Sequence, residues 1–197
     1  IDNKKLSTGK LENDDWKRFN EAISILADTN IYIEDNAGVT AQEIRAKCRR
    51  LANSEDGLGL VVIDYLQLVS SGSKRVESRQ VEVSEISRSL KTMALELGVP
   101  VIALSQLSRS AEKRESNQPM LADLRESGSL EQDADMVLFI NRKDYYEKTK
   151  DFNQKIVPAE LIIAKHRKGG LGTVNLLFEL NMSSFKSQLK ATGDENE

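Results

Sequence analysis

The stretch Leu60-Val61-Val62-Ile63-Asp64 decides the fold of this chain. Four large aliphatic residues follow one another without alternation and end at a carboxylate. A strand buried on both faces has this pattern, and such strands belong to parallel sheets covered by helices. Open α/β sheets bind ligands at the carboxyl edge, where nucleotide hydrolases place an acid that binds Mg²⁺. Asp64 is therefore a candidate Mg²⁺ ligand; the alternative is an acid that only caps the strand end.

A second unbroken apolar run, Val99 to Leu104, ends in Ser105 and Gln106. If this strand lies parallel to the first, Gln106 and Asp64 share one sheet edge. A side-chain amide at that edge can hydrogen-bond a γ-phosphate or an attacking water. The alternative for Gln106 is a polar strand end that faces solvent.

The phosphate-binding loop of nucleotide hydrolases is missing from this sequence. The only Gly-Lys pair is Gly9-Lys10, with Lys4 where the first glycine of G-x-x-x-x-G-K-[ST] should stand and Leu11 where the hydroxyl should stand. The chain therefore resembles the distal part of a nucleotide-driven domain. Its start at Ile1, without methionine, fits such a fragment.

Composition excludes several classes of protein. The chain has 197 residues, of which 39% are hydrophobic, enough for one domain with a core. The net charge is only −3, so a nucleic-acid site must be a local patch. One cysteine (Cys48) and one histidine (His166) exclude a disulfide framework, a cysteine-rich zinc site and a multi-histidine metal site. No apolar run approaches the roughly 20 residues of a membrane span, which favours a cytoplasmic protein.

Hydrophobic spacing predicts the remaining elements. Asn13 is the expected cap of a helix whose apolar stripe, from Trp16 to Leu26, should be core. Thr40 and Glu43 have capping-box spacing ahead of another helix. The further predictions are a strand at 31–33, a helix from about 77 to 97, a long polar segment at 108–135, a buried strand at 136–140, and a hairpin of strands 159–164 and 173–179. This order predicts an α/β three-layer fold, with a mostly parallel sheet and an antiparallel hairpin at its edge.

Two polar segments are further candidate sites. Arg125 could pair with a phosphate and Gly128 would let a backbone N–H approach one closely, although an ordinary surface loop is the alternative. Lys165 and Arg167 lie in the connection of the predicted hairpin, which could project an arginine toward another subunit's nucleotide. The alternative there is a solvated basic turn.

Five strings together resemble the ATPase domain of the DnaB family of replicative DNA helicases. They are GLVVIDYLQLV (59–69), RQVEVSEISRSLK (79–91), VPVIALSQLSR (99–109), DLRESGSLEQDAD (123–135) and IIAKHRKGGLGTV (162–174). The resemblance implies a RecA-like domain over residues 1–185, lacking its amino-terminal part, with a disordered tail at 186–197.

The resemblance also implies roles for particular residues. Asp64 would be the Walker B aspartate that organises Mg²⁺, and Gln106 the γ-phosphate sensor. Arg125, Glu126 and Gly128 would follow the DNA backbone inside a ring. Arg167 would be an arginine finger acting in trans, with Lys165 beside it. The cofactors implied are ATP and Mg²⁺.

The family further implies a homohexamer that translocates 5′ to 3′ along single-stranded DNA, a helicase loader as partner, and primase bound through an amino-terminal domain. Because the phosphate loop and the catalytic glutamate are not among these residues, this chain alone is expected to be inactive. Three alternatives stay open: another RecA-like ATPase of recombinase or RadA type, a non-catalytic fragment that docks a helicase loader, and a nucleotide-binding α/β module of unknown role.

Overall fold

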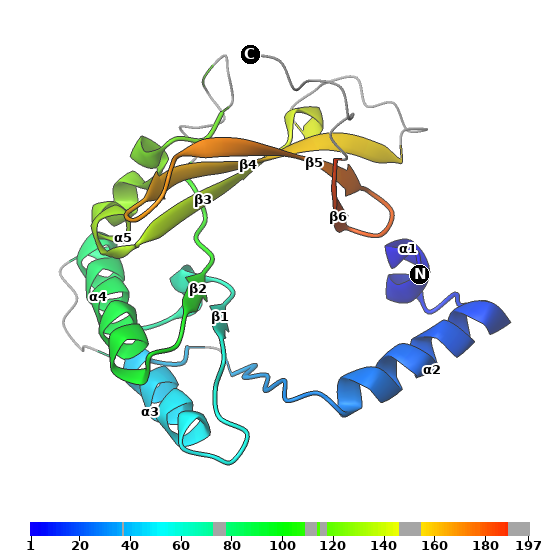
Figure 1. Ribbon diagram of the computed structural model, residues 1–197, viewed down its shortest axis with the longest axis horizontal. Coiled ribbons are helices and arrows are strands. Elements are labelled where there is room, and N and C mark those ends of the chain that lie inside the picture. The colour runs from blue at the N-terminus through cyan, green and yellow to red at the C-terminus, as the bar shows by residue number, and fades with distance from the viewer. Residues whose placement is uncertain (37, 73–77, 109–113, 115–117, 146–154, 189–197) are drawn as a thin grey trace. The chain divides into compact units, whose positions relative to one another are not determined.

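The computed structural model describes residues 1–36, 38–72, 78–108, 114, 118–145 and 155–188, except for the side chains of residues 125–127. The chain divides into two compact units, and Figure 1 labels the helices and strands. One contains residues 32–137 and 165–168, and the other contains residues 1–31, 138–164 and 169–197. In the described parts of the chain, no helix is long and apolar enough to cross a membrane.

The first unit is built on a parallel pair of short strands. Strand β1 (Val61–Ile63) pairs with β2 (Val101–Ala103), with Ile63 opposite Ala103. Helices α3 (Ala41–Ala52) and α4 (Arg79–Leu97) lie on the same side of this pair in Figure 1. The core that they share with the strands consists of Ala41, Cys48, Ile63, Leu66, Val69, Ile86, Leu90 and Met93. The predicted parallel pairing is therefore confirmed.

The other face of this strand pair is exposed, contrary to the expectation of strands buried on both faces. Val62 is 57% exposed and Ile102 is 53% exposed. Among the described residues of this unit, helices α3 and α4 pack on the face that carries Ile63. The unbroken aliphatic run correctly predicted the strand, but among the described residues of this unit its second face stays exposed.

Local signals set the helix ends in this unit. Thr40 and Glu43 form the predicted capping box of α3. Ser78 caps α4, and Gly98 ends it in the left-handed conformation at φ 64°. A β-carbon at that φ would be strained, which is why glycine suits this position. The predicted start of α4 at Glu77 lies outside the described residues.

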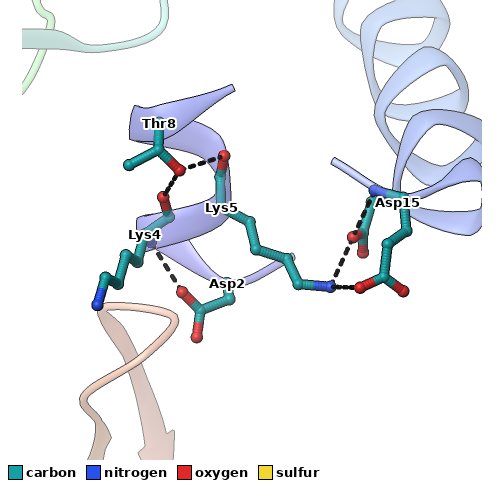
Figure 2. A network of polar contacts seen from close by, with 6 residues as sticks. Asp2, Lys4, Lys5, Thr8 and Asp15 are labelled. Atoms are coloured by element: carbon teal, nitrogen blue, oxygen red, sulfur yellow. Dashed lines mark hydrogen bonds and ion pairs between the residues drawn. The ribbon is translucent and has the colours of Figure 1, made fainter. Parts of the chain in front are cut away.

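The second unit contains helices α1 (Asn3–Thr8) and α2 (Asn13–Ala27). Lys5 joins them, with its Nζ donating to Asp15 at 2.9 Å and to Glu12 at 3.0 Å (Figure 2). The pKa of Asp15 is lowered by the hydrogen bond from Lys5 and then by the backbone N–H of Glu12. Glu12, rather than the predicted Asn13, is the cap of α2.

Helix α2 does not form the predicted core. Trp16 and Ile23 are each 47% exposed and Leu26 is 57% exposed, so the stripe packs on little of the described chain. The predicted strand at 31–33 is also wrong, because this segment is irregular and exposed. A strand needs a hydrogen-bonded neighbour, which apolar composition alone does not supply.

A four-stranded sheet has the order β3-β4-β5-β6. Its strands are β3 (Met136–Asn141), β4 (Ile156–His166), β5 (Gly172–Glu179) and β6 (Ser184–Ser187). The antiparallel β4–β5 pair is the predicted hairpin, longer than expected, whereas β6 was not predicted. The described strands thus form two sheets instead of one. Residues 189–197 of the predicted tail lie outside the described residues.

Strand β3 alternates between exposed and buried residues, so it is buried on one face only. Between β2 and β3, the long polar segment predicted at 108–135 contains helical structure in its described residues. It forms a short helical segment, η3 (Leu121–Ser127), followed by helix α5 (Gly128–Asp133). Two further single turns, η1 (Leu66–Leu68) and η4 (Lys143–Tyr145), complete the described elements.

Candidate nucleotide site and its connections

Asp64 and Gln106 follow neighbouring parallel strands at the same edge of the sheet. Leu104 N donates to Ile63 O at 2.9 Å, and Leu66 N donates to Leu104 O at 2.9 Å, so pairing continues past both strand ends. Asp64 and Gln106 are both exposed. Their predicted placement at one edge is therefore confirmed, while their roles stay predictions.

Gln67 was missed by the sequence reasoning, although it connects the two strand ends. Its Nε2 donates to Ser105 Oγ at 3.1 Å, and its Oε1 accepts from Gln106 N at 3.4 Å. Arg79 at the start of α4 donates to Gln67 O at 2.7 Å. The signal available in the sequence was a single amide among aliphatic residues, three positions after Asp64.

A small pocket of about 90 Å³ lies beside this contact. Its polar lining comes from Gln67, Arg79, Gln106, Ser108 and Asp123, and its apolar lining comes from Val83, Leu107 and Leu124. This volume holds a few water molecules and is too small for a whole nucleotide. The pocket therefore joins the sheet edge to η3 and does not itself form the nucleotide site.

The segment η3 is attached to the end of β2 through Asp123. Ser108 N donates to Asp123 O at 3.1 Å. The buried carboxylate of Asp123 accepts from Met120 N at 2.8 Å and pairs with Arg114. A buried carboxylate with these partners fixes the backbone of η3, which carries Arg125 and Glu126.

Gly128 is the first residue of α5, and its backbone is right-handed, with φ −54° and ψ −25°. A β-carbon added there would contact nothing within 4 Å. Neither conformation nor packing within the described chain requires glycine at this position. A remaining physical reason for glycine at this position is that a ligand can approach its backbone closely.

Lys165 and Arg167 lie at the other end of α5. Lys165 Nζ donates to the backbone oxygens of Glu131 and Gln132, and Arg167 pairs with Asp135 at 3.0 Å. The pKa of Asp135 is lowered first by its hydrogen bond to Lys91, and Arg167 lowers it further. Within the described residues, no hydrogen bond or ion pair joins Lys165 or Arg167 to Asp64 or Gln106. Within the described chain, Lys165 and Arg167 therefore make no direct polar contact with the predicted site residues Asp64 and Gln106.

The donor set at the sheet edge fits Mg²⁺ held together with phosphates. In the described residues, no group of three or more His, Cys, Asp or Glu side chains could hold a metal ion by itself. Mg²⁺ in nucleotide sites takes one or two carboxylates, and the other ligands are phosphate oxygens and waters. A single exposed carboxylate, Asp64, suits that arrangement.

Comparison with known proteins identifies the family of this chain. The family model of the DnaB-like helicase C terminal domain matches residues 1–187. The chain belongs to this family. It is 53% identical over 185 residues to the replicative DNA helicase DnaB of Geobacillus stearothermophilus, and 49% identical to that of Mycobacterium intracellulare. Each match covers 94% of this chain, but only 40% and 31% of the two relatives.

Two solved structures are similar to this DnaB-like domain. One is an ATPase domain that superimposes with a TM-score of 0.86 and 43% identity, covering 96% of this chain and 66% of that one. The other is a DnaB-like replicative helicase, solved in a study of its interactions with primase. It gives a TM-score of 0.85 and 43% identity, covering 96% of this chain and 46% of that one. The RecA-like α/β fold expected from the resemblance therefore agrees with these ATPase-domain neighbours.

Proposed function

We propose that this chain is part of a hexameric replicative DNA helicase, which couples ATP hydrolysis to 5′ to 3′ movement along single-stranded DNA and to duplex unwinding. The observation that carries the proposal is the shared sheet edge of Asp64 and Gln106 in a DnaB-like domain. At this edge Asp64 would hold Mg²⁺, and Gln106 would hydrogen-bond the γ-phosphate. The phosphate loop that completes such a site is not among the 197 residues.

We infer that ATP binds between subunits. Arg167 and Lys165 are held by α5 of their own chain, while much of the Arg167 side chain remains accessible, with 46% exposed. This supports a finger that reaches the nucleotide of a neighbouring subunit. Such a finger stabilises charge on the transferred phosphoryl group. Hydrolysis would then depend on closure of the subunit interface.

DNA contact is proposed for Arg125, Glu126 and Gly128, at the η3–α5 junction. Neither the backbone conformation nor the packing at position 128 requires glycine, and this supports a close approach of the Gly128 backbone to a phosphate. Because such contacts read the DNA backbone, binding should be independent of sequence and sensitive to salt. A helicase loader and primase are proposed as partners of the full-length protein.

Turnover of the full-length protein tests the proposal. ATP hydrolysis should be stimulated by single-stranded DNA of any sequence and lost in Asp64→Ala. Arg167→Ala should keep nucleotide affinity but lower kcat by about 10³-fold or more. By contrast, the 197-residue chain alone should show no sub-micromolar ATP binding in calorimetry, because it lacks the phosphate loop. Full turnover in Asp64→Ala would refute the assignment of the site.

A further inference from the structure

Helix α5 carries a proposed functional group at each of its ends. It begins at Gly128, two residues after Glu126, and it ends at Asp133. Lys165 and Arg167, the proposed finger residues, bind its carboxyl end. A helix of six residues is only about 9 Å long. The proposed DNA loop, residues 125–128, therefore leads into one end of this short helix, and the proposed finger residues bind its other end.

The carboxyl end of α5 is held by these cations. The last four carbonyls of a helix have no partner within it and form the negative end of its dipole. Lys165 Nζ donates to Glu131 O, and to Gln132 O at 3.4 Å. Arg167 Nη2 donates to Gln132 O at 2.5 Å. A displacement of α5 would therefore displace both side chains.

Asp135, which follows α5, holds Arg167 in place from a second direction. Its backbone oxygen accepts from Arg167 N at 2.9 Å, and its Oδ1 pairs with Arg167 Nη1 at 3.0 Å. Its other carboxylate oxygen pairs with Lys91 of α4. The Asp135 carboxylate, two residues after the end of α5, thus links Arg167 to Lys91 of α4. Asp135 is not among the residues of the proposed nucleotide site.

We propose that α5 couples the DNA loop of each subunit to the finger that the same subunit offers to its neighbour, with Asp135 as the positioning residue for Arg167. This inference rests on the proposed function. DNA bound at the amino end of α5 sets the position of its carboxyl end, and hence the direction of Arg167. DNA held by one subunit would then stimulate hydrolysis at the site that it shares with the next.

Asp135→Asn in the full-length protein is the test, because it removes the charge and keeps a similar shape. The stimulation of kcat by single-stranded DNA should fall by roughly 5-fold or more, as expected for loss of a coupling between sites. KM for ATP and Kd for DNA should stay close to wild type, since Asp135 is proposed to contact neither ligand. Glu96→Gln is the matched control, because Glu96 also bridges two cations, Arg45 and Arg49, on an exposed surface. This control should keep full stimulation.

Hydrogen exchange gives a second readout that does not need turnover. In Asp135→Asn, amides of α5 should exchange faster than in wild type, while those of α3 should not change. Wild-type DNA stimulation in Asp135→Asn, beside a strongly impaired Arg167→Ala, would overturn the coupling and leave the proposed function intact. Loss of DNA affinity in Asp135→Asn would also overturn it. Normal turnover in Arg167→Ala would instead contradict the proposed finger itself.

Discussion

Gln67 and Gln106 are hydrogen-bonded across the ends of the two parallel strands, with Gln67 Oε1 accepting from Gln106 N at 3.4 Å. The other end of the same amide holds Ser105 Oγ at 3.1 Å. The backbone that presents Gln106 is therefore positioned by a residue on the turn after Asp64.

Replacing Gln67 by alanine should loosen this strand end. A typical intramolecular hydrogen bond contributes about 1 kcal/mol, so the unfolding free energy of the chain should fall by roughly 1–2 kcal/mol. In the full-length protein, kcat should fall more than nucleotide affinity. Denaturant melts and steady-state ATP hydrolysis measure the two effects. Gln80→Ala, an exposed amide on α4, is the control and should change neither quantity; equal behaviour of the two variants would refute a positioning role for Gln67.

Gly128→Ala should separate DNA binding from stability. Alanine suits a right-handed helical position better than glycine, so the chain should be more stable by roughly 0.5–1 kcal/mol. The added methyl group should nevertheless weaken single-stranded DNA binding by the full-length protein, measured by fluorescence anisotropy. Gly98→Ala should destabilise the chain without changing DNA binding. Its backbone is left-handed at φ 64°, so alanine should cost about 1 kcal/mol and leave DNA affinity unchanged. Unchanged DNA affinity in Gly128→Ala would argue against backbone contact there.

Met93→Ala should test the core of the first unit. Met93 is fully buried at 0% exposure, whereas Leu95 on the same helix is 72% exposed. Removing the buried side chain should destabilise the chain by roughly 2–5 kcal/mol. Leu95→Ala should change the unfolding free energy by no more than about 0.5 kcal/mol. Thermal or urea unfolding compares them directly, and similar losses in both variants would mean that α4 is packed on a different face.

Glu96 should make stability depend on pH in the acid range. Hydrogen bonds from Arg49 first and then Arg45 lower the pKa of its carboxyl below the ordinary value. A lowered pKa in the folded state means that the contribution is present above the unfolded pKa, near 4.5. It is lost as the pH falls through the folded value. The stability difference between wild type and Glu96→Gln should therefore be largest near neutral pH and shrink below about pH 4. A difference that grows with acid would contradict this sign.

The parallel pairing of the two aliphatic runs could be predicted from the sequence, because runs without alternation are typical of parallel strands. The capping box at Thr40 and the glycine stop at Gly98 were also readable, since both signals are local. The exposure of Trp16 could not be predicted in this way, because periodicity shows that a helix has an apolar face without showing what covers it. The strand predicted at residues 31–33 was wrong for a related reason: apolar residues do not show whether a neighbouring strand is present to pair with them.

The parts of the site that sequence reasoning missed depend on tertiary contacts. Gln67 and Asp135 have unremarkable spacing, and their importance comes from partners more than 30 positions away. Helix α5 was not predicted within the polar segment at 108–135, because its six residues are mostly polar and too few for helical periodicity to appear. In contrast, Asp64 and Gln106 were found because each follows an apolar strand.

Mixing subunits tests the central claim most directly. Full-length Asp64→Ala protein and full-length Arg167→Ala protein should each be nearly inactive alone, since each lacks one half of every site. Hexamers formed from both should recover ATP hydrolysis, because some interfaces then pair an intact Asp64 edge with an intact Arg167. Recovered turnover that varies with the mixing ratio is the expected result. Mixed hexamers that form but remain as inactive as the separate variants would contradict a nucleotide site shared between subunits.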